Sequence, residues 1–282
     1  MFNTRFTANL SVTLAALALS SSAAFAQTKV VFAGSDTLAG AMTDAIIAAG
    51  MDQQIQYAGG GSGVGEKGLL NGDQGIAPMS REMKPEIIQQ LATIGVTPVA
   101  HVVALDGISM FVKSTNPVPS LDIQTVARIY TCEFTMWEQI PGSGLKGSIK
   151  VYRRNDQSGT TDAFKHFTGL KNFGACVTVL AETADISEAT ARDGSAIGYA
   201  GLSGKTADNR AVAIAAKPGA PAVLPTTHTV RDFSYPMARN LYVYEATGAR
   251  TANAAEATLL ESITDRSFMD PIAQAHEFIT ID

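Results

Sequence analysis

The chain has 282 residues, of which 46% are hydrophobic, so it can bury the cores of two domains of ordinary size. Its formal net charge is −5, and its 21 basic residues form neither a run nor an aromatic-interleaved patch, so nucleic acid is not an expected partner. Beyond residue 26, no apolar run approaches the ~20 residues that a helix needs to cross a bilayer.

Residues 1–26 are predicted to form a secretory signal peptide. Arg5 supplies a positive start, residues 10–19 an apolar stretch, and Ala24-Phe25-Ala26 a small-x-small cleavage site. We therefore expect cleavage before Gln27 and a periplasmic or otherwise exported protein. An uncleaved membrane anchor is the alternative, but the apolar stretch is short for a stop-transfer span.

Two units of the mature chain lead from a predicted strand through a small polar turn into a predicted helix. The first has a strand over 29–33, the turn Gly34-Ser35-Asp36-Thr37 and a helix over 38–49. The second has a strand over 54–57, a glycine-dense turn over 59–65 that includes Ser62, and a helix over 66–70. Glycines let backbone amides approach a ligand closely, although a flexible surface loop would have the same composition.

A third unit of this kind has the strongest anion-binding chemistry. A strand over 148–152 leads through residues 153–161 into a helix over 161–167. Amides at a helix start have no partner inside the helix and carry the positive end of its dipole. Ser158 and Thr160 add hydroxyl donors, Gly159 allows close approach, and Arg154 can offer two N–H groups to one tetrahedral anion. The alternative is an ordinary helix cap with solvated arginines.

The rest of the chain continues to alternate between strands and helices. A strand over 75–79 ends in Ser80-Arg81, where Arg81 is either a second cation for the anion or a solvated side chain. Two long extended stretches, 96–112 and 235–244, are expected to cross between two lobes. Further strands are predicted over 177–180, 196–200 and 211–216, and further helices over 86–94, 122–130, 186–192, 251–263 and 270–278.

These elements predict an α/β protein with two lobes, each built on a mainly parallel sheet flanked by helices and joined by two hinge strands. We expect residues 27–104 and 235–282 to form lobe 1, and residues 105–234 to form lobe 2. Ligands of such sheets lie beyond the carboxyl ends of the strands, which is where all three polar turns fall. The turns are therefore expected to converge on one anion between the lobes.

The two cysteines, Cys132 and Cys176, are expected to form a disulfide, because a lone pair in an exported protein is more often a disulfide than a metal site. Two buried free thiols are the alternative. The cysteines and the four histidines show no metal-binding spacing, so neither a metal nor another cofactor is expected.

Many short motifs, in one order over nearly the whole mature chain, resemble the exported phosphate-binding proteins of bacterial and archaeal phosphate ABC transporters. The resemblance implies a two-lobed periplasmic-binding-protein fold that closes on inorganic phosphate and delivers it to a membrane permease. It rests on Gly34-Ser35-Asp36-Thr37-Leu38, Gly59-Gly60-Gly61-Ser62-Gly63, Ser80-Arg81-Glu82-Met83-Lys84, Leu105-Asp106-Gly107-Ile108, Asn116-Pro117-Val118, residues 129–137, Arg154 with Ser158-Gly159-Thr160, Ile197-Gly198-Tyr199 and Tyr235-Pro236.

The resemblance also implies which residues bind the ligand. It points to Thr37, the Leu38 amide, Ser62, Arg154, Ser158, Gly159 and Thr160, and we add Ser35, Ser80 and Arg81 as candidates. Asp156 matches a carboxylate that pairs with the ligand-binding arginine and holds its guanidinium in place. One branch of the family has an aspartate after the serine, which accepts the proton of hydrogen phosphate. This chain has Ser80-Arg81 there, so Asp36 or a backbone carbonyl is left for that role. Glycine is usual where Cys132 stands, so the family does not imply the disulfide.

The predicted function is that of an exported solute-binding protein, a monomer without enzymatic activity, that captures phosphate for an ABC transporter. Three alternatives remain open on the sequence alone. The ligand could be another tetrahedral oxyanion such as sulfate or arsenate. The protein could be a secreted phosphatase-like hydrolase with Ser62 or Ser158 as nucleophile. It could also be a surface-displayed or signalling relative that binds phosphate without serving a transporter.

Overall fold

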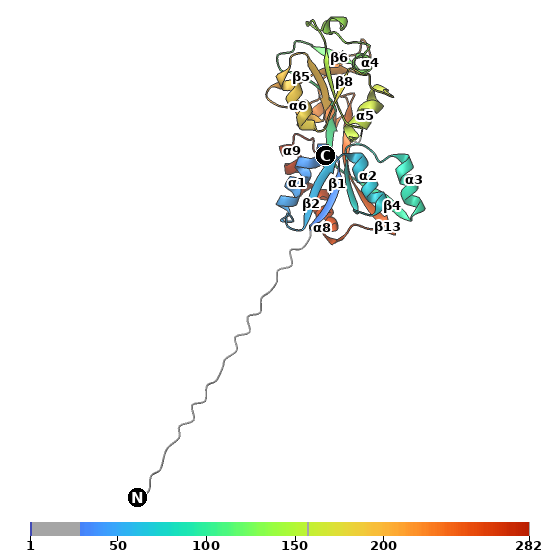
Figure 1. Cartoon of the computed structure of the whole chain (residues 1–282), viewed down its shortest axis with the longest axis vertical. Coiled ribbons are helices and arrows are strands. Elements are labelled where there is room, and N and C mark those ends of the chain that lie inside the picture. Colours follow the sequence, from blue (N-terminus) through green and yellow to red (C-terminus); the bar gives the residue numbers. More distant parts are fainter. Residues whose placement is uncertain (2–28, 157, 282) are drawn as a thin grey trace.

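A computed structural model of the chain describes Met1, residues 29–156 and residues 158–281. The predicted signal peptide and its cleavage site before Gln27 lie outside the described residues, apart from Met1. Figure 1 shows two lobes stacked along the long axis of the molecule, each with strands flanked by helices. The two-lobed α/β architecture predicted from the sequence is confirmed.

Lobe 1 is formed by the elements from β1 to α3 and by the last two helices of the described residues. Its core is an apolar cluster in which Phe32, Met42, Leu241 and Leu259 are fully buried. A second cluster around Leu91 packs beneath the third helix. The elements are β1 (Val30–Gly34), the 3-10 turn η1 (Asp36–Leu38), α1 (Ala39–Ala48), β2 (Ile55–Gly60), α2 (Ser62–Asn71), β3 (Ile76–Met79), α3 (Pro85–Thr93), α8 (Ala254–Thr264) and α9 (Arg266–Ala275).

Lobe 2 is built on a five-stranded sheet in the order β10-β5-β9-β7-β8. Its core contains Tyr130, Trp137, Phe164 and Tyr199, and the rings of Phe164 and Tyr199 stack at 4.0 Å between centroids. The elements are β5 (Ser109–Lys113), β6 (Ser120–Asp122), α4 (Ile123–Tyr130), η2 (Trp137–Gln139), β7 (Lys150–Arg154), α5 (Gly159–Thr168), β8 (Val177–Leu180), α6 (Thr183–Arg192), β9 (Ala196–Ala200), η3 (Leu202–Gly204), β10 (Asn209–Ala211), β11 (Ala213–Ala215), β12 (Ala222–Val223) and α7 (Thr227–Arg231).

Two long strands, β4 (Val96–Gly107) and β13 (Ala238–Gly248), run from lobe 1 to the junction of the lobes. They pair in antiparallel register along their whole length, and β3 adds to the other edge of β13. Beyond Gly107, the Ile108 amide donates to the Met237 carbonyl at 2.9 Å, and the chain enters β5 of lobe 2. The two extended stretches predicted to cross between lobes are these hinge strands.

The end of the chain makes a third connection between the lobes, which the sequence did not predict. After α9 in lobe 1, Ile279 exchanges both backbone hydrogen bonds with Leu105 on β4, at 2.7 and 2.9 Å. Ile279 is buried in the core cluster of lobe 2, and Ile281 packs against that cluster. Residues 278–281 therefore fasten lobe 1 to the hinge and to lobe 2.

Several details differ from the sequence prediction: some helix bounds are shifted, and the strand predicted over 211–216 is two short strands, β10 and β11, in different sheets. The sheets mix parallel and antiparallel pairs: β7 pairs in parallel with β8 and β9, whereas β5 and the hinge strands pair antiparallel because the chain passes between the lobes in both directions. Helix α2 begins at Ser62 rather than at residue 66, although three of its first seven residues are glycines of low helix propensity. A Cβ at Gly65 would lie 3.2 Å from both Ala33 O and Ala77 Cβ, so α2 packs closely on β1 and β3 at this glycine.

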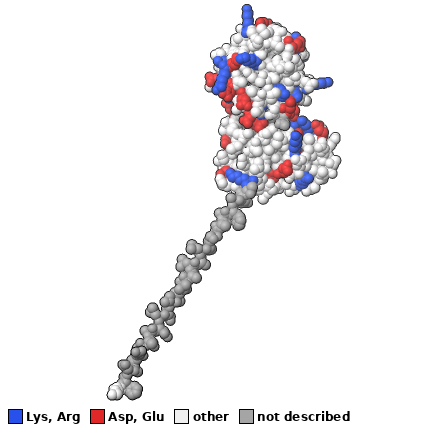
Figure 2. Space-filling model, in the orientation of Figure 1, with Lys and Arg blue, Asp and Glu red and all other residues white. Residues whose placement is uncertain are grey.

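Charged side chains on the face shown in Figure 2 are mostly scattered, with acidic ones prominent where the lobes meet. No continuous basic surface is present on that face among the described residues. On this face, an anion would have to be held by local donors rather than by a continuous positive surface.

Cys132 and Cys176 form a disulfide, as predicted, with their Cα atoms 5.9 Å apart. The bridge joins the turn after α4 to the residue before β8, so it closes a loop within lobe 2 across a sequence separation of 44 residues.

Replacing both cysteines with serine is expected to lower the free energy of unfolding by about 2–4 kcal/mol, because the cross-link restricts the unfolded chain. Urea unfolding followed by circular dichroism measures the change. Dithiothreitol should destabilise the wild type by a similar amount and leave the double serine variant unchanged. Equal stability of the oxidised wild type and the variant would contradict the prediction.

Candidate anion-binding site

Three helix starts from the two lobes meet at the lobe junction. Lobe 1 supplies two of them: the turn η1, which follows β1 and leads into α1, and the start of α2, which follows β2. Lobe 2 supplies the third, the start of α5, which follows β7. The Thr37 hydroxyl of η1 lies 2.9 Å from the Thr160 hydroxyl of α5, and both side chains are buried. The structure therefore brings together the three polar turns that the sequence predicted to converge.

Ser62 and Ser80 of lobe 1 lie close to Gly159 of lobe 2. The Ser80 amide donates to Ser62 Oγ at 3.1 Å, which holds the start of α2 against the end of β3. A Cβ built on Gly159 would lie 2.1 Å from Ser62 Oγ, 2.8 Å from Ser62 Cβ and 2.7 Å from Ser80 Oγ. Because such distances are far below van der Waals contact, only glycine fits at the first position of α5 in this closed arrangement.

The first turn of lobe 1 contributes a buried hydroxyl. Ser35 is 1% exposed, and its Oγ has no hydrogen-bond partner among the described residues, which is costly unless a further group satisfies it. The Ser35 carbonyl accepts from Tyr57 Oη at 2.7 Å and from the Leu38 amide at 3.1 Å. The Leu38 amide, which was expected to face the ligand, is thus used within the turn.

Burial, and after it the charge of Asp36, raise the pKa of Tyr57 well above its usual value. The Tyr57 phenol therefore stays protonated at neutral pH, where it donates to the Ser35 carbonyl and fixes the first turn.

Arg154, at the end of β7, is fully buried. Its Nε donates to the Ala181 carbonyl and its Nη1 to Thr183 Oγ1, both at 2.9 Å, and its Nη2 donates to Asp36 Oδ2 at 2.6 Å. Asp36 belongs to lobe 1, so this ion pair spans the lobes; its other oxygen accepts from the Gly60 amide at 2.7 Å. A guanidinium has five N–H groups, so two of Arg154 are left for a ligand within the described part of the chain.

The expected pairing of Asp156 with Arg154 is wrong. Asp156 pairs with Arg153 at 2.9 Å and with Lys165 at 3.4 Å, and its side chain is 66% exposed. Successive side chains of a strand point to opposite faces, so Arg153 and Arg154 leave β7 on different sides, and only Arg153 faces Asp156. Asp36 takes the place that was assigned to Asp156.

Ser158 caps helix α5: its Oγ accepts from the Thr161 amide at 3.4 Å, and its side chain is buried. The hydroxyl proton remains available for a further acceptor because the cap uses only a lone pair. The capping role and a ligand role are therefore compatible for this serine.

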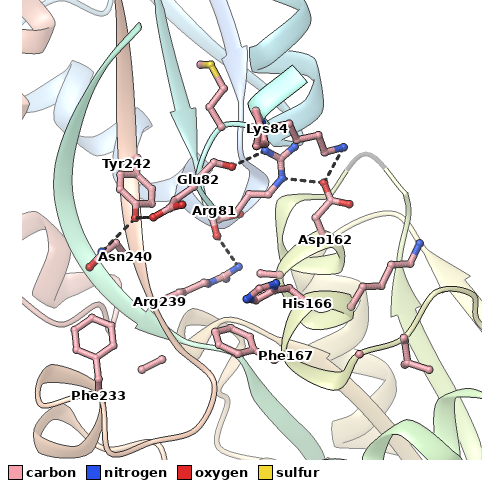
Figure 3. A pocket seen from close by; sticks show the side chains of 18 residues that line it. Arg81, Glu82, Lys84, Asp162, His166, Phe167, Phe233, Arg239, Asn240 and Tyr242 are labelled. Carbon is pink, nitrogen blue, oxygen red and sulfur yellow. Dashed lines mark hydrogen bonds and ion pairs between the residues drawn. The ribbon is translucent and has the colours of Figure 1, made fainter. Parts of the chain in front are cut away.

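Arg81 lies beside the site rather than among its open donors. Its Nη1 and Nη2 donate to the two oxygens of Glu66 at 2.6 and 2.9 Å, and its Nε donates to Asp162 of lobe 2 at 2.8 Å. Figure 3 shows Arg81 and Lys84 both paired with Asp162 at a groove between the lobes. The groove has a volume of ≈ 790 Å³. Arg81 thus joins the lobes through carboxylates, which the sequence did not suggest.

Arg239, on β13, was not predicted as a site residue. It is 6% exposed, and its side chain bonds to Asp106 on the other hinge strand, to the Ser80 carbonyl of lobe 1 and to Thr160 of lobe 2. Figure 3 shows it reaching from the hinge strand toward the segment that carries Arg81. An arginine inside a hinge segment made mainly of apolar and aromatic residues is the signal that could have identified it, because buried arginines need partners.

The arginines around the site are all balanced by carboxylates: Arg154 by Asp36, Arg239 by Asp106, and Arg81 by Glu66 and Asp162. A bound anion would therefore rely on hydroxyls, helix-start amides and the remaining N–H groups of Arg154 rather than on excess positive charge.

Within residues 29–156 and 158–281, no cluster of three or more His, Cys, Asp or Glu side chains is arranged to hold a metal ion. In the same part of the chain, no helix combines the length and apolar character of a membrane span. The hydroxyls of the two candidate nucleophiles, Ser62 and Ser158, contact Ser80 and the Thr161 amide.

Comparisons with known proteins agree with this architecture. Residues 20–264 match the profile of the PBP superfamily domain. Among curated relatives, phosphate-binding protein PstS of Pseudomonas aeruginosa is 31% identical over 226 residues, which cover 75% of this chain and 70% of that protein. Protein SphX of Synechococcus elongatus is 29% identical over 65% of this chain and 57% of its own length.

Solved structures share the fold at lower identity. A candidate phosphate ABC transporter substrate-binding protein from Clostridium perfringens, with bound phosphate, has a TM-score of 0.77 at 24% identity, covering 90% of this chain and 100% of that chain. An ABC-type phosphate transport receptor from Vibrio cholerae has a TM-score of 0.71 at 19% identity, covering 89% and 100%.

Proposed function

Since the chain belongs to the PBP superfamily, and within it to the PstS-related phosphate-binding proteins, we propose that it captures inorganic phosphate between its lobes and delivers it to an ABC transporter. The protein is exported after signal-peptide cleavage before Gln27, acts as a monomer and catalyses no reaction. Its partner in delivery is the membrane permease of that transporter.

The observation that carries this proposal is the buried Arg154 beside the converging helix starts of both lobes. Its guanidinium is held by Ala181, Thr183 and Asp36, so the two remaining N–H groups have fixed directions and lose little entropy when they bind. The Ser35 hydroxyl, which has no partner within the described residues, adds a donor that an oxyanion would satisfy.

Capture works by closure of the lobes. Thr37, Ser35 and Ser62 belong to lobe 1, whereas Arg154, Ser158, Gly159 and Thr160 belong to lobe 2, so neither lobe alone supplies the full set of donors. Phosphate oxygens accept charge-assisted and helix-start hydrogen bonds from both sides, and this gain favours the closed state. Opening at the permease would reverse these contacts and release the ion.

Isothermal calorimetry of the mature protein tests the ligand. We expect phosphate and the isosteric arsenate to bind with micromolar or tighter affinity, since the donors surround a tetrahedral anion. Sulfate is the discriminating control because it has the same shape without a proton. Absence of heat with phosphate, together with strong binding of another oxyanion, would overturn the assignment.

Two further measurements separate the alternatives. A chromogenic phosphate ester should not be hydrolysed, whereas turnover that disappears in Ser158→Ala would favour a hydrolase.

Delivery is tested by phosphate uptake in cells that lack their own phosphate receptor. Restored uptake supports the transport role, and binding without uptake would favour a signalling or surface-displayed relative.

A further inference from the structure

Arg239 occupies the point where the hinge and both lobes meet, and its hydrogen bonds account for all five of its N–H groups. Nε and Nη2 donate to Asp106 Oδ2 at 3.0 and 2.6 Å. Nη1 donates to the Ser80 carbonyl at 3.0 Å, and Nη1 and Nη2 both donate to Thr160 Oγ1 at 3.2 Å. Because no N–H group is left, Arg239 does not bind the anion itself.

The two bonds to Thr160 decide what its hydroxyl can do. A threonine hydroxyl has one proton and two lone pairs. Arg239 fills both lone pairs, so the Thr160 proton must point away from Arg239 and toward another acceptor. In this structure that acceptor is Thr37 Oγ1 at 2.9 Å, which leaves the Thr37 proton directed elsewhere in the site.

We infer that Arg239 is a positioning residue for phosphate binding: it locks the Thr160 hydroxyl as a hydrogen-bond donor at the lobe junction. The inference rests on the proposed function of the site. With the Thr160 proton donated to Thr37, the Thr37 proton is the one that remains for the ligand. Thr37 then donates to an unprotonated phosphate oxygen, and a ligand O–H group is disfavoured at that position.

Arg239 is itself held rigidly, as a positioning residue must be. Asp106 is fully buried on the opposite hinge strand, and its second oxygen accepts from the Leu202 amide at 2.7 Å. The guanidinium is therefore fixed by β4 on one side and by the Ser80 carbonyl of lobe 1 on another. Thr160 comes from lobe 2, so its hydroxyl is oriented only when α5 reaches the hinge in the closed state.

A mutant cycle measured by calorimetry with inorganic phosphate tests the inference. The first variant combines Arg239→Gln with Asp106→Asn, so that the ion pair is removed and no buried charge is left unpaired. The second variant is Thr160→Val. The third variant carries all three substitutions. Each change alone should weaken binding by roughly 10-fold or more, as expected for a lost buried hydrogen-bond network. If Arg239 acts through Thr160, the combined protein should bind nearly as well as Thr160→Val alone.

Two further variants keep the test sound. Thr160→Ser retains the hydroxyl, so loss of Arg239 should still weaken its phosphate binding, whereas the same loss should change Thr160→Val little. Arg239→Lys keeps the positive charge opposite Asp106 but cannot reach all three partners of the guanidinium. It replaces the neutral pair in the mutant cycle if the protein with the neutral pair does not fold. Thermal unfolding without ligand shows whether each variant is folded. Additive losses would overturn the inference while leaving the proposed function intact. Failure of the wild type to bind phosphate would overturn both.

Discussion

Arg154→Met is expected to weaken phosphate binding by roughly 10²–10³-fold. The change removes the chief cation of the site and leaves the Asp36 carboxylate, formerly 2.6 Å from Nη2, facing the anion without a partner. Breaking a buried ion pair from one side costs about 3–5 kcal/mol, and here the loss falls on the closed, ligand-bound state. The interlobe pair exists only when the lobes are together, so the open protein should remain folded.

Arg153→Met is the matched control for this variant. The neighbouring arginine pairs with the exposed Asp156 and packs 4.6 Å from the Phe173 ring, so its loss removes an equal charge at almost the same place in the sequence. Although the Arg153 side chain is only 13% exposed, its partner Asp156 is 66% exposed, so solvent screens the pair. Its loss should cost about 0–1 kcal/mol and leave the phosphate affinity nearly unchanged. Calorimetry on both variants makes the comparison. Similar losses for Arg153→Met and Arg154→Met would show that net charge, rather than the geometry of Arg154, governs binding.

Gly159→Ala is expected to weaken phosphate binding by roughly 10–100-fold, because it prevents the lobes from closing fully. The added Cβ would lie within 2.8 Å of both Ser62 Oγ and Ser62 Cβ, so rotation of the Ser62 hydroxyl cannot relieve the overlap. Overpacking of such contacts costs about 1–3 kcal/mol and shifts the balance toward the open state. The clash is between lobes, so the stability of each lobe should be unaffected.

Small-angle X-ray scattering with and without phosphate measures the closure directly. The wild type should contract when phosphate is added, and Gly159→Ala should contract less. Gly194→Ala is the control, because a Cβ there meets no atom within 4 Å and the backbone does not need glycine. Full contraction and wild-type affinity in Gly159→Ala would show that the two lobes do not meet at this residue when the ligand is bound.

The parts of the site that could be predicted are those encoded by neighbouring residues. Each strand, polar turn and helix start lies within about twenty residues, so local pattern identified Thr37, Ser62 and Thr160. The facing of side chains along β7 also follows from the local sequence. Because side chains alternate between the two faces of a strand, this pattern could have paired Arg153 with Asp156 and left Arg154 for another partner. The later start that was predicted for α2 reflects glycine propensity, which packing on β1 and β3 overrides.

The parts that could not be predicted depend on contacts between distant segments. Asp36 and Arg154 are 118 positions apart, and Asp106 and Arg239 are 133 positions apart. Nothing in either local pattern specifies such a partner, since each pair forms only after the hinge strands have brought the lobes together. The same reason explains why the carboxylate partners of Arg81 were missed: Glu66 and Asp162 approach it from different lobes.

The C-terminal crossing at Ile279 has a practical consequence for experiments on this protein. A tag or fluorophore attached after the C-terminal residues would lie next to the lobe junction. There it would disturb the backbone hydrogen bonds between Leu105 and Ile279 and the hydrogen bond from Arg231 to Thr280. A label ahead of β1, at the outer end of lobe 1, would avoid that interference. The C-terminal position suits a sensor of lobe movement, and the N-terminal position suits purification.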